Sequence, residues 1–207
     1  MRLVDAVSLR SRRRKLALFT ETIRPTADTT VVDVGVDDSG FGERSVEQGG
    51  CGTLNFFEEL YPWPERITAV GIHEGRRFAE HYPAASYVQA SALELPFDDG
   101  AFDVYFSNAV IEHVGRREAQ RRFVSEALRV APQVFITTPN RWFPVELHTR
   151  APLVHWLPDA AAHRAYDLIR KPWAKENHLL GPRDLRELFP VEVRIVNLGM
   201  TLVAIVG

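Results

Sequence analysis

The segment 87–114 constrains the fold of this chain more than any other part of the sequence. It predicts an apolar strand, a turn at Leu95-Pro96-Phe97 with the acidic tip 98–100, and a second strand followed by the polar run 108–114. Polar residues at the carboxyl ends of buried parallel strands form the edge where open α/β sheets bind ligands. The segment therefore predicts a parallel sheet with a ligand site at that edge.

The rest of the chain alternates predicted strands with predicted helices. Apolar and β-branched runs predict strands, and apolar residues at helical spacing predict helices. After a short helix at 182–189, two strands joined at Gly199 predict an antiparallel hairpin. We therefore expect an α/β, doubly wound, mostly parallel seven-stranded sheet with a C-terminal antiparallel hairpin. The predicted strands are 31–34, 67–72, 86–89, 101–107, 134–137, 191–198 and 200–206, and the main predicted helices are 9–24, 75–81, 116–130 and 159–169.

Composition limits the classes of protein to which the chain can belong. A chain of 207 residues buries roughly 70% of its unfolded surface in one core. Its net charge of −2 gives no reason to expect a nucleic acid. The single cysteine, Cys51, excludes a disulfide framework, and no run approaches the roughly 18 apolar residues of a membrane span. We expect one cytoplasmic domain over 1–207 with no membrane contact, and the sequence leaves its oligomeric state open.

Two predicted segments lie outside the sheet, a leading helix and an insertion. The leading helix within 1–28 places Leu9, Leu16, Phe19 and Ile23 opposite a basic cluster, which we expect to be a solvated surface rather than a nucleic-acid or lipid contact. The segment 140–181 is rich in Pro, Trp and His and is too long for a plain crossover, so we expect an insertion that covers the substrate. The basic cluster consists of Arg10, Arg12, Arg13, Arg14 and Lys15.

The motifs resemble those of a known family. Val31-Val32-Asp33-Val34-Gly35, the Leu-Pro-Phe turn and the Phe102-Asp103-Val104 strand resemble the class I S-adenosylmethionine-dependent methyltransferases, in particular the type 11-like methyltransferase domain. The resemblance covers about 29–140, and 137–148 is similar to the segment after the fifth strand. It implies a Rossmann-like fold, S-adenosyl-L-methionine as cofactor and a small-molecule methyl acceptor.

The resemblance also implies a set of cofactor-binding residues at the strand ends. Gly35 matches the first motif, whose glycines let the backbone approach the cofactor, but Asp37 stands at the next alternating glycine position. The ribose-binding acid falls at His73, with Glu74 as a substitute one residue later. Ser91 stands where the family usually has an Asp for the adenine. The expected set is Asp33, Gly35, His73, Glu74, Ser91, Ala92, Leu93 and Asn108.

Four residues, Glu112, His113, Asn140 and Arg141, are candidates for binding or activating the methyl acceptor. His113, beside Glu112, follows the fourth strand and can take a proton from a nucleophile at neutral pH. It can equally pack against Glu112 or cap a loop. Asn140 and Arg141 begin a wall that orients a polar acceptor, although Arg141 can instead pair with Glu146 and the nearby tryptophans can simply pack the insertion.

The sequence does not favour a metal site. Some related quinone-type methyltransferases carry Glu-x-x-Glu-His after the fourth strand and hold a divalent metal there, but Ala109 replaces the first Glu in this chain. Glu146 and His148 could supply replacement ligands. Such clusters more often reflect hydrogen bonding, so we expect no metal.

Three functions compete on the sequence alone. The leading one is S-adenosylmethionine-dependent methyl transfer to a small-molecule acceptor. The alternative is a non-catalytic methyltransferase-fold binding protein with a degenerate cofactor site, because Asp37, His73 and Ser91 depart from the motifs. A nicotinamide dehydrogenase is disfavoured because the Gly-x-Gly-x-x-Gly spacing is missing.

Overall fold

The computed structural model describes residues 3–38, 55–146 and 148–207, so Cys51 and most of the Gly-rich segment 36–53 lie outside the described residues. In the described chain, one sheet has the strand order β3-β2-β1-β4-β5-β7-β6. The first five strands pair in parallel, β7 pairs antiparallel with β5, and β6 with β7. The predicted fold is confirmed. The strands are β1 (Val31–Val34), β2 (Ile67–Gly71), β3 (Ser86–Gln89), β4 (Val104–Asn108), β5 (Gln133–Pro139), β6 (Arg194–Asn197) and β7 (Thr201–Val206).

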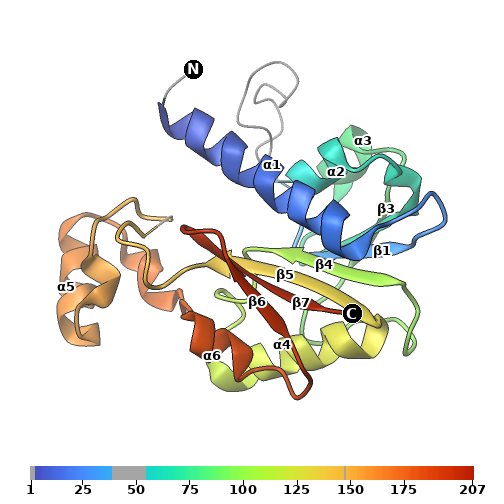
Figure 1. Cartoon of the computed structure of the whole chain (residues 1–207). Helices are drawn as coiled ribbons and strands as arrows, with labels where there is room; N and C mark the ends of the chain where they lie inside the picture. The colour runs from blue at the N-terminus through green and yellow to red at the C-terminus, as the bar shows by residue number, and fades with distance from the viewer. Residues whose placement is uncertain (1–2, 39–54, 147) are drawn as a thin grey trace.

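Helices cover both faces of the sheet (Figure 1). On one face α1 (Leu3–Ile23), α2 (Phe56–Leu60) and α3 (Arg76–His81) close a core in which Phe19 packs edge-on against the Phe57, Phe106 and Phe135 rings. On the other face lie α4 (Arg117–Val130) and α6 (Pro182–Arg186). Because both faces are covered, all four residues of β1 are buried, including Asp33.

The prediction that the basic cluster of the leading helix is exposed to solvent is wrong for Lys15. Arg10, Arg13 and Arg14 are exposed, but Lys15 is buried. Lys15 lies four residues before the buried Phe19, and residues at that spacing share a helix face. Its Nζ donates to Asn108 Oδ1 at the end of β4. Burial, followed by the nearby Arg12 charge, lowers the pKa of Lys15 to about 7.

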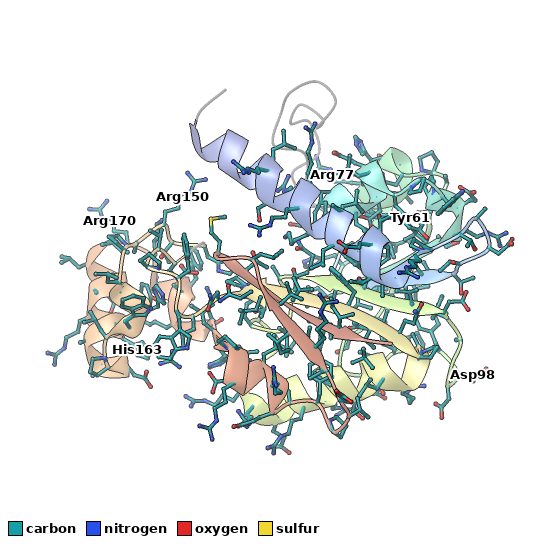
Figure 2. All side chains as sticks on the ribbon, in the orientation of Figure 1. Tyr61, Arg77, Asp98, Arg150, His163 and Arg170 are labelled. Carbon is teal, nitrogen blue, oxygen red and sulfur yellow. The ribbon has the colours of Figure 1, made fainter. Side chains whose placement is uncertain are left out.

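The Leu-Pro-Phe turn is held in place by α4. Arg129 donates to the Leu95 and Phe97 carbonyls at 3.0 and 2.6 Å, and Glu126 accepts a hydrogen bond from the Leu95 N–H at 2.8 Å. Asp98, at the tip of the turn, points into solvent (Figure 2). The turn therefore fixes the path of the chain just after the segment 90–93, which borders the ligand edge of the sheet.

The predicted insertion projects from the carboxyl end of β5 (Figure 1). It contains η2 (Val154–Trp156), α5 (Asp159–Leu168) and η3 (Pro172–Glu176). Ala162, Tyr166 and Ala174 form its small buried cluster. In the part of the chain that the structure describes, no helix is long and apolar enough to cross a membrane.

Candidate active site

A cleft of about 480 Å³ opens at the carboxyl ends of β1, β2 and β4. Six of the residues predicted from the sequence line it, namely Gly35, His73, Ser91, Ala92, Leu93 and His113. Four other predicted residues, Asp33, Glu74, Asn108 and Glu112, do not line it. Its other walls are Val34, Val36, Asp37, Val70, Gly71, Ile72, Ala90, Ala109, Val110 and Val114.

Gly35 makes the tight turn that starts the cleft. Its φ is +100°, and its N–H donates to the Val70 carbonyl at 2.8 Å. A Cβ at this position would stand 2.1 Å from Val110 Cγ2. Both the backbone conformation and the close approach of the next loop therefore require glycine.

Asp37 lines the same cleft and is held by Asn55. Asn55 Oδ1 accepts from the Asp37 N–H at 2.8 Å, and Asn55 Nδ2 donates to the Asp37 carbonyl at 2.7 Å. Although Asn55 is the residue before α2, its side chain makes no capping hydrogen bond to that helix. The Asn55 amide instead fixes the backbone at the position where the family has its second glycine.

Asp33 faces a smaller pocket beside the cleft, where Asn55 and Asn108 also lie. Burial raises the pKa of Asp33 to about 7 and raises that of the neighbouring Glu58 well above its usual value, with the Asp33 charge adding to the effect on Glu58. Among the described residues, no Lys, Arg or His forms an ion pair with either carboxyl group. This end of the site therefore favours a positively charged ligand.

Replacing Glu58 with Gln should stabilise the protein more at pH 8 than at pH 5. A carboxyl group whose folded-state pKa is raised contributes stability below its unfolded pKa, and that stability is lost as pH rises through the folded pKa. Wild type should therefore lose stability from about pH 4 to above pH 7, and the variant should lose less. Thermal unfolding at the two pH values measures this, with the exposed Glu65→Gln as control. An equal effect of Glu58→Gln at both values would contradict the prediction.

The ribose and adenine positions differ from the expected pattern. Glu74 is exposed, lies 3.8 Å from Arg76 and does not border the cleft. His73 lines the cleft, and its carbonyl accepts a hydrogen bond from the Tyr87 hydroxyl at 2.7 Å. Ser91 Oγ accepts a hydrogen bond from the Leu93 N–H at 3.2 Å. Ser91 and Leu93 thus form a turn along the wall of the cleft.

On the wall of the cleft, His113 contacts a second histidine, which comes from the insertion. His113 Nε2 lies 3.1 Å from His148 Nε2, and His148 Nδ1 lies 2.8 Å from Glu146 Oε1. Glu112 is fully buried beneath the two rings, with Oε1 3.8 Å from His113 Nε2 and 3.7 Å from His148 Nε2. We call Glu112, His113 and His148 the Glu-His-His cluster.

The surroundings shift the ionisation of each group. Burial raises the pKa of Glu112 to about 7. Burial would also raise the pKa of Glu146, but hydrogen bonds from His148 and Thr149 outweigh it and lower the pKa to about 2. Burial and then the His148 charge lower the pKa of His113. Burial opposes the charged form of His148 too, yet Glu146 and Glu112 raise its pKa.

Asn140 and Arg141 do not border this cleft. The buried Asn140 donates from Nδ2 to the Gly199 carbonyl at 2.9 Å and accepts at Oδ1 from the Trp142 N–H at 3.0 Å, so it ties β5 to the hairpin. Arg141 lines a second cavity of about 470 Å³ between α4 and the insertion. Glu146 bonds to His148 and Thr149 rather than to Arg141. Trp142 is 59% exposed.

The fold and cleft define the class I methyltransferase architecture, a Rossmann-like sheet whose last pair of strands is antiparallel. Residues 48–133 match the family described as a methyltransferase domain. This match supports the predicted methyltransferase domain over those residues. None of the curated proteins matches the sequence.

Solved structures with this fold share little sequence with the chain. The PH0226 protein from Pyrococcus horikoshii is 15% identical with a TM-score of 0.61, covering 96% of this chain and 90% of its own. The N-methyltransferase NodS from Bradyrhizobium japonicum, in complex with S-adenosyl-L-homocysteine, is 14% identical with a TM-score of 0.55, covering 94% and 85%. A Rhodobacter sphaeroides protein described as a putative Zn-dependent alcohol dehydrogenase is 13% identical with a TM-score of 0.60, covering 93% and 88%. At these identities the likeness shows the fold alone.

Proposed function

We propose that this protein transfers the methyl group of S-adenosylmethionine to a small polar acceptor. The observation that carries the proposal is the cleft that runs from the Gly35 turn to His113. A ligand with its adenosine along the segment 90–93 and its methionine part near Asp33 would carry its ammonium and sulfonium charges toward the buried carboxyl groups. Its methyl group would then face the Glu-His-His cluster.

The acceptor would enter through the second cavity. This cavity is bounded by cationic and hydrogen-bonding side chains, among them Arg116, Arg141 and His155, and it suits a polar or anionic molecule. Its lining contacts the backbone of the cluster, because the His178 N–H donates to the Glu112 carbonyl at 2.8 Å and Gln120 Nε2 donates to the His178 carbonyl at 3.0 Å. Arg141 would therefore orient the acceptor from the cavity wall.

The chemical step is one in-line displacement at the methyl carbon. Alignment of nucleophile and sulfonium would supply most of the rate. The imidazole of His113 is the group best placed to receive the acceptor's proton. His148, held by Glu146, would fix the orientation of the His113 ring through their shared contact.

Calorimetry with S-adenosylmethionine, S-adenosylhomocysteine and NAD tests the proposal without knowledge of the acceptor. We expect both adenosyl ligands to bind with one site per chain and NAD to give no heat of binding. NAD binding without adenosyl binding would support a dehydrogenase and overturn the proposal. Binding of neither adenosyl ligand by folded protein would overturn it in favour of a fold that has lost its cofactor.

A non-catalytic binding protein remains the second candidate, and one observation favours it. Neither acidic residue expected beside the cofactor lines the cleft, since Asp33 faces the adjoining pocket and Glu74 faces solvent. Binding of S-adenosylhomocysteine without methyl transfer to any of a broad panel of polar hydroxyl and amine compounds would favour this candidate.

A further inference from the structure

We infer that the Glu-His-His cluster binds one divalent transition-metal ion. The inference deepens the proposed function, on which its role in catalysis rests, because the cluster stands where the acceptor's reacting group would be placed. The binding of the ion itself depends only on the geometry of Glu112, His113 and His148.

The three facing atoms have the spacing of ligands around one ion. Glu112 Oε1, His113 Nε2 and His148 Nε2 form a triangle with sides of 3.1, 3.7 and 3.8 Å. The point equidistant from the corners of such a triangle lies about 2.1 Å from each. Bonds from Zn²⁺ to imidazole nitrogen and carboxylate oxygen are about 2.0–2.2 Å long. An ion at this point would reach all three atoms without movement of any side chain.

His148 and Glu112 are each oriented by a hydrogen-bond partner outside the cluster. His148 Nδ1 bonds to Glu146 Oε1 at 2.8 Å, so its proton lies there and its Nε2 lone pair faces the centre of the cluster. Glu112 Oε2 accepts from Thr138 Oγ1 at 2.9 Å. Burial lowers the pKa of the His113 ring, and the Asn177 side chain opposes this effect by favouring the charged form. A carboxylate, carbonyl or amide partner of this kind usually accompanies a metal-binding histidine.

A bound cation would also explain why Glu112 Oε1 is buried without a hydrogen-bond partner among the described residues. This oxygen lies 3.8 and 3.7 Å from the His113 and His148 Nε2 atoms. A buried polar oxygen left unpaired costs about 1–3 kcal/mol or more. A cation at the centre of the cluster would remove that cost. The competing occupant of the same space is a single proton shared between the two imidazoles.

The ligand set indicates which ions fit. Two imidazoles and one carboxylate suit Zn²⁺, Co²⁺ and Fe²⁺, whereas Mg²⁺ and Ca²⁺ prefer oxygen ligands. Three protein ligands leave at least one coordination position open, as in catalytic metal sites. The sequence expectation of no metal rested on the loss of an acid at Ala109, and we revise it because His148 supplies a third ligand from the insertion.

The open position gives the ion a role in the proposed reaction. An acceptor hydroxyl bound there would ionise more readily and release its proton to solvent. Its oxygen would attack the methyl carbon as the carbon–sulfur bond breaks, leaving neutral S-adenosylhomocysteine. The two histidines would then act as ligands, and the ion would replace His113 as the means of activating the nucleophile.

Titration of the chelator-treated full chain with Co²⁺ and with Zn²⁺ tests the inference. We expect one ion per chain by calorimetry, and visible absorption bands of protein-bound Co²⁺ that Zn²⁺ displaces. His148→Ala and Glu112→Gln should each weaken binding by roughly 100-fold or more, and Glu146→Gln by about 10- to 100-fold. The matched control is His163→Ala, an exposed histidine on α5 that lines the other cavity (Figure 2).

Two results would overturn the inference. One is absence of stoichiometric Co²⁺ binding by protein whose thermal unfolding is unchanged after chelator treatment, which would leave the shared proton as the occupant. The other is binding that survives in both His148→Ala and Glu112→Gln with wild-type affinity. Neither result touches the proposed function, which the calorimetry with S-adenosylhomocysteine tests separately.

Discussion

Replacing Gly35 with Val is expected to abolish measurable binding of S-adenosylhomocysteine. The position has a φ of +100°, and an added Cβ would meet Val110 Cγ2 at 2.1 Å. A branched side chain must therefore displace the loop after β4 or project into the cleft, and both remove space that the cofactor needs. Calorimetry should show a loss of at least about 100-fold, equivalent to roughly 3 kcal/mol.

The matched control for this change is Gly199→Val. Gly199 also has a positive φ, +89°, but nothing lies within 4 Å of its Cβ position and it stands in the β6–β7 turn. Both variants should lose stability through backbone strain, on the order of 1–3 kcal/mol. Gly199→Val should nevertheless keep its affinity for S-adenosylhomocysteine. Wild-type affinity in Gly35→Val would mean that the cofactor site is misplaced.

The strands could be predicted from the sequence because their signal is local. Ranges 31–34 and 86–89 match β1 and β3 at both ends. The fourth predicted strand starts too early, since the strand proper begins at Val104. The apolar pattern continues through Phe102, but its N–H bonds to the Val130 carbonyl, and Asp103 bonds to Thr30 before β1. Tertiary hydrogen bonds of this kind leave no periodic trace in the sequence.

The site was predictable only where the chain follows a strand. Gly35, Ser91 and His113 could be placed because each comes shortly after a strand whose end faces the same edge. The partnership of His113 with His148 joins residues 35 positions apart through an insertion without a regular pattern. Asn140 also follows a strand, yet its amide is used by the hairpin, which returns from the chain's far end. Proximity to a strand end thus indicates a location and not an orientation.

The burial of Lys15 could have been predicted from its helical spacing, although its charge suggests exposure to solvent. It shares a helix face with Phe19, and its long apolar stem can be buried while its amine reaches Asn108. The composition of the surrounding basic run argues for solvent, and the helical spacing argues for burial. The structure follows the spacing.

The His113→Ala variant is expected to lose turnover but to keep its affinity for S-adenosylhomocysteine. His113 lines the cleft, and in the proposed binding pose it would face the reacting methyl group rather than the adenosine. Affinity for S-adenosylhomocysteine should therefore stay within a few fold, while transfer to an acceptor identified with wild-type protein slows by roughly 10²- to 10⁴-fold. His81→Ala, the control at an exposed histidine on α3 that lines neither cavity, should keep both.

The same experiment separates the two ways in which His113 can activate the acceptor. If the imidazole takes the proton itself, chelator treatment should leave wild-type turnover unchanged, and added Co²⁺ should not alter the His113→Ala rate. If the imidazole holds an ion, chelator should slow wild type to near the rate of the variant, and Zn²⁺ or Co²⁺ should restore it. A loss that falls equally on S-adenosylhomocysteine affinity and on turnover would contradict both roles, because it would make His113 a cofactor contact or a structural residue. Unchanged turnover would remove it from the mechanism.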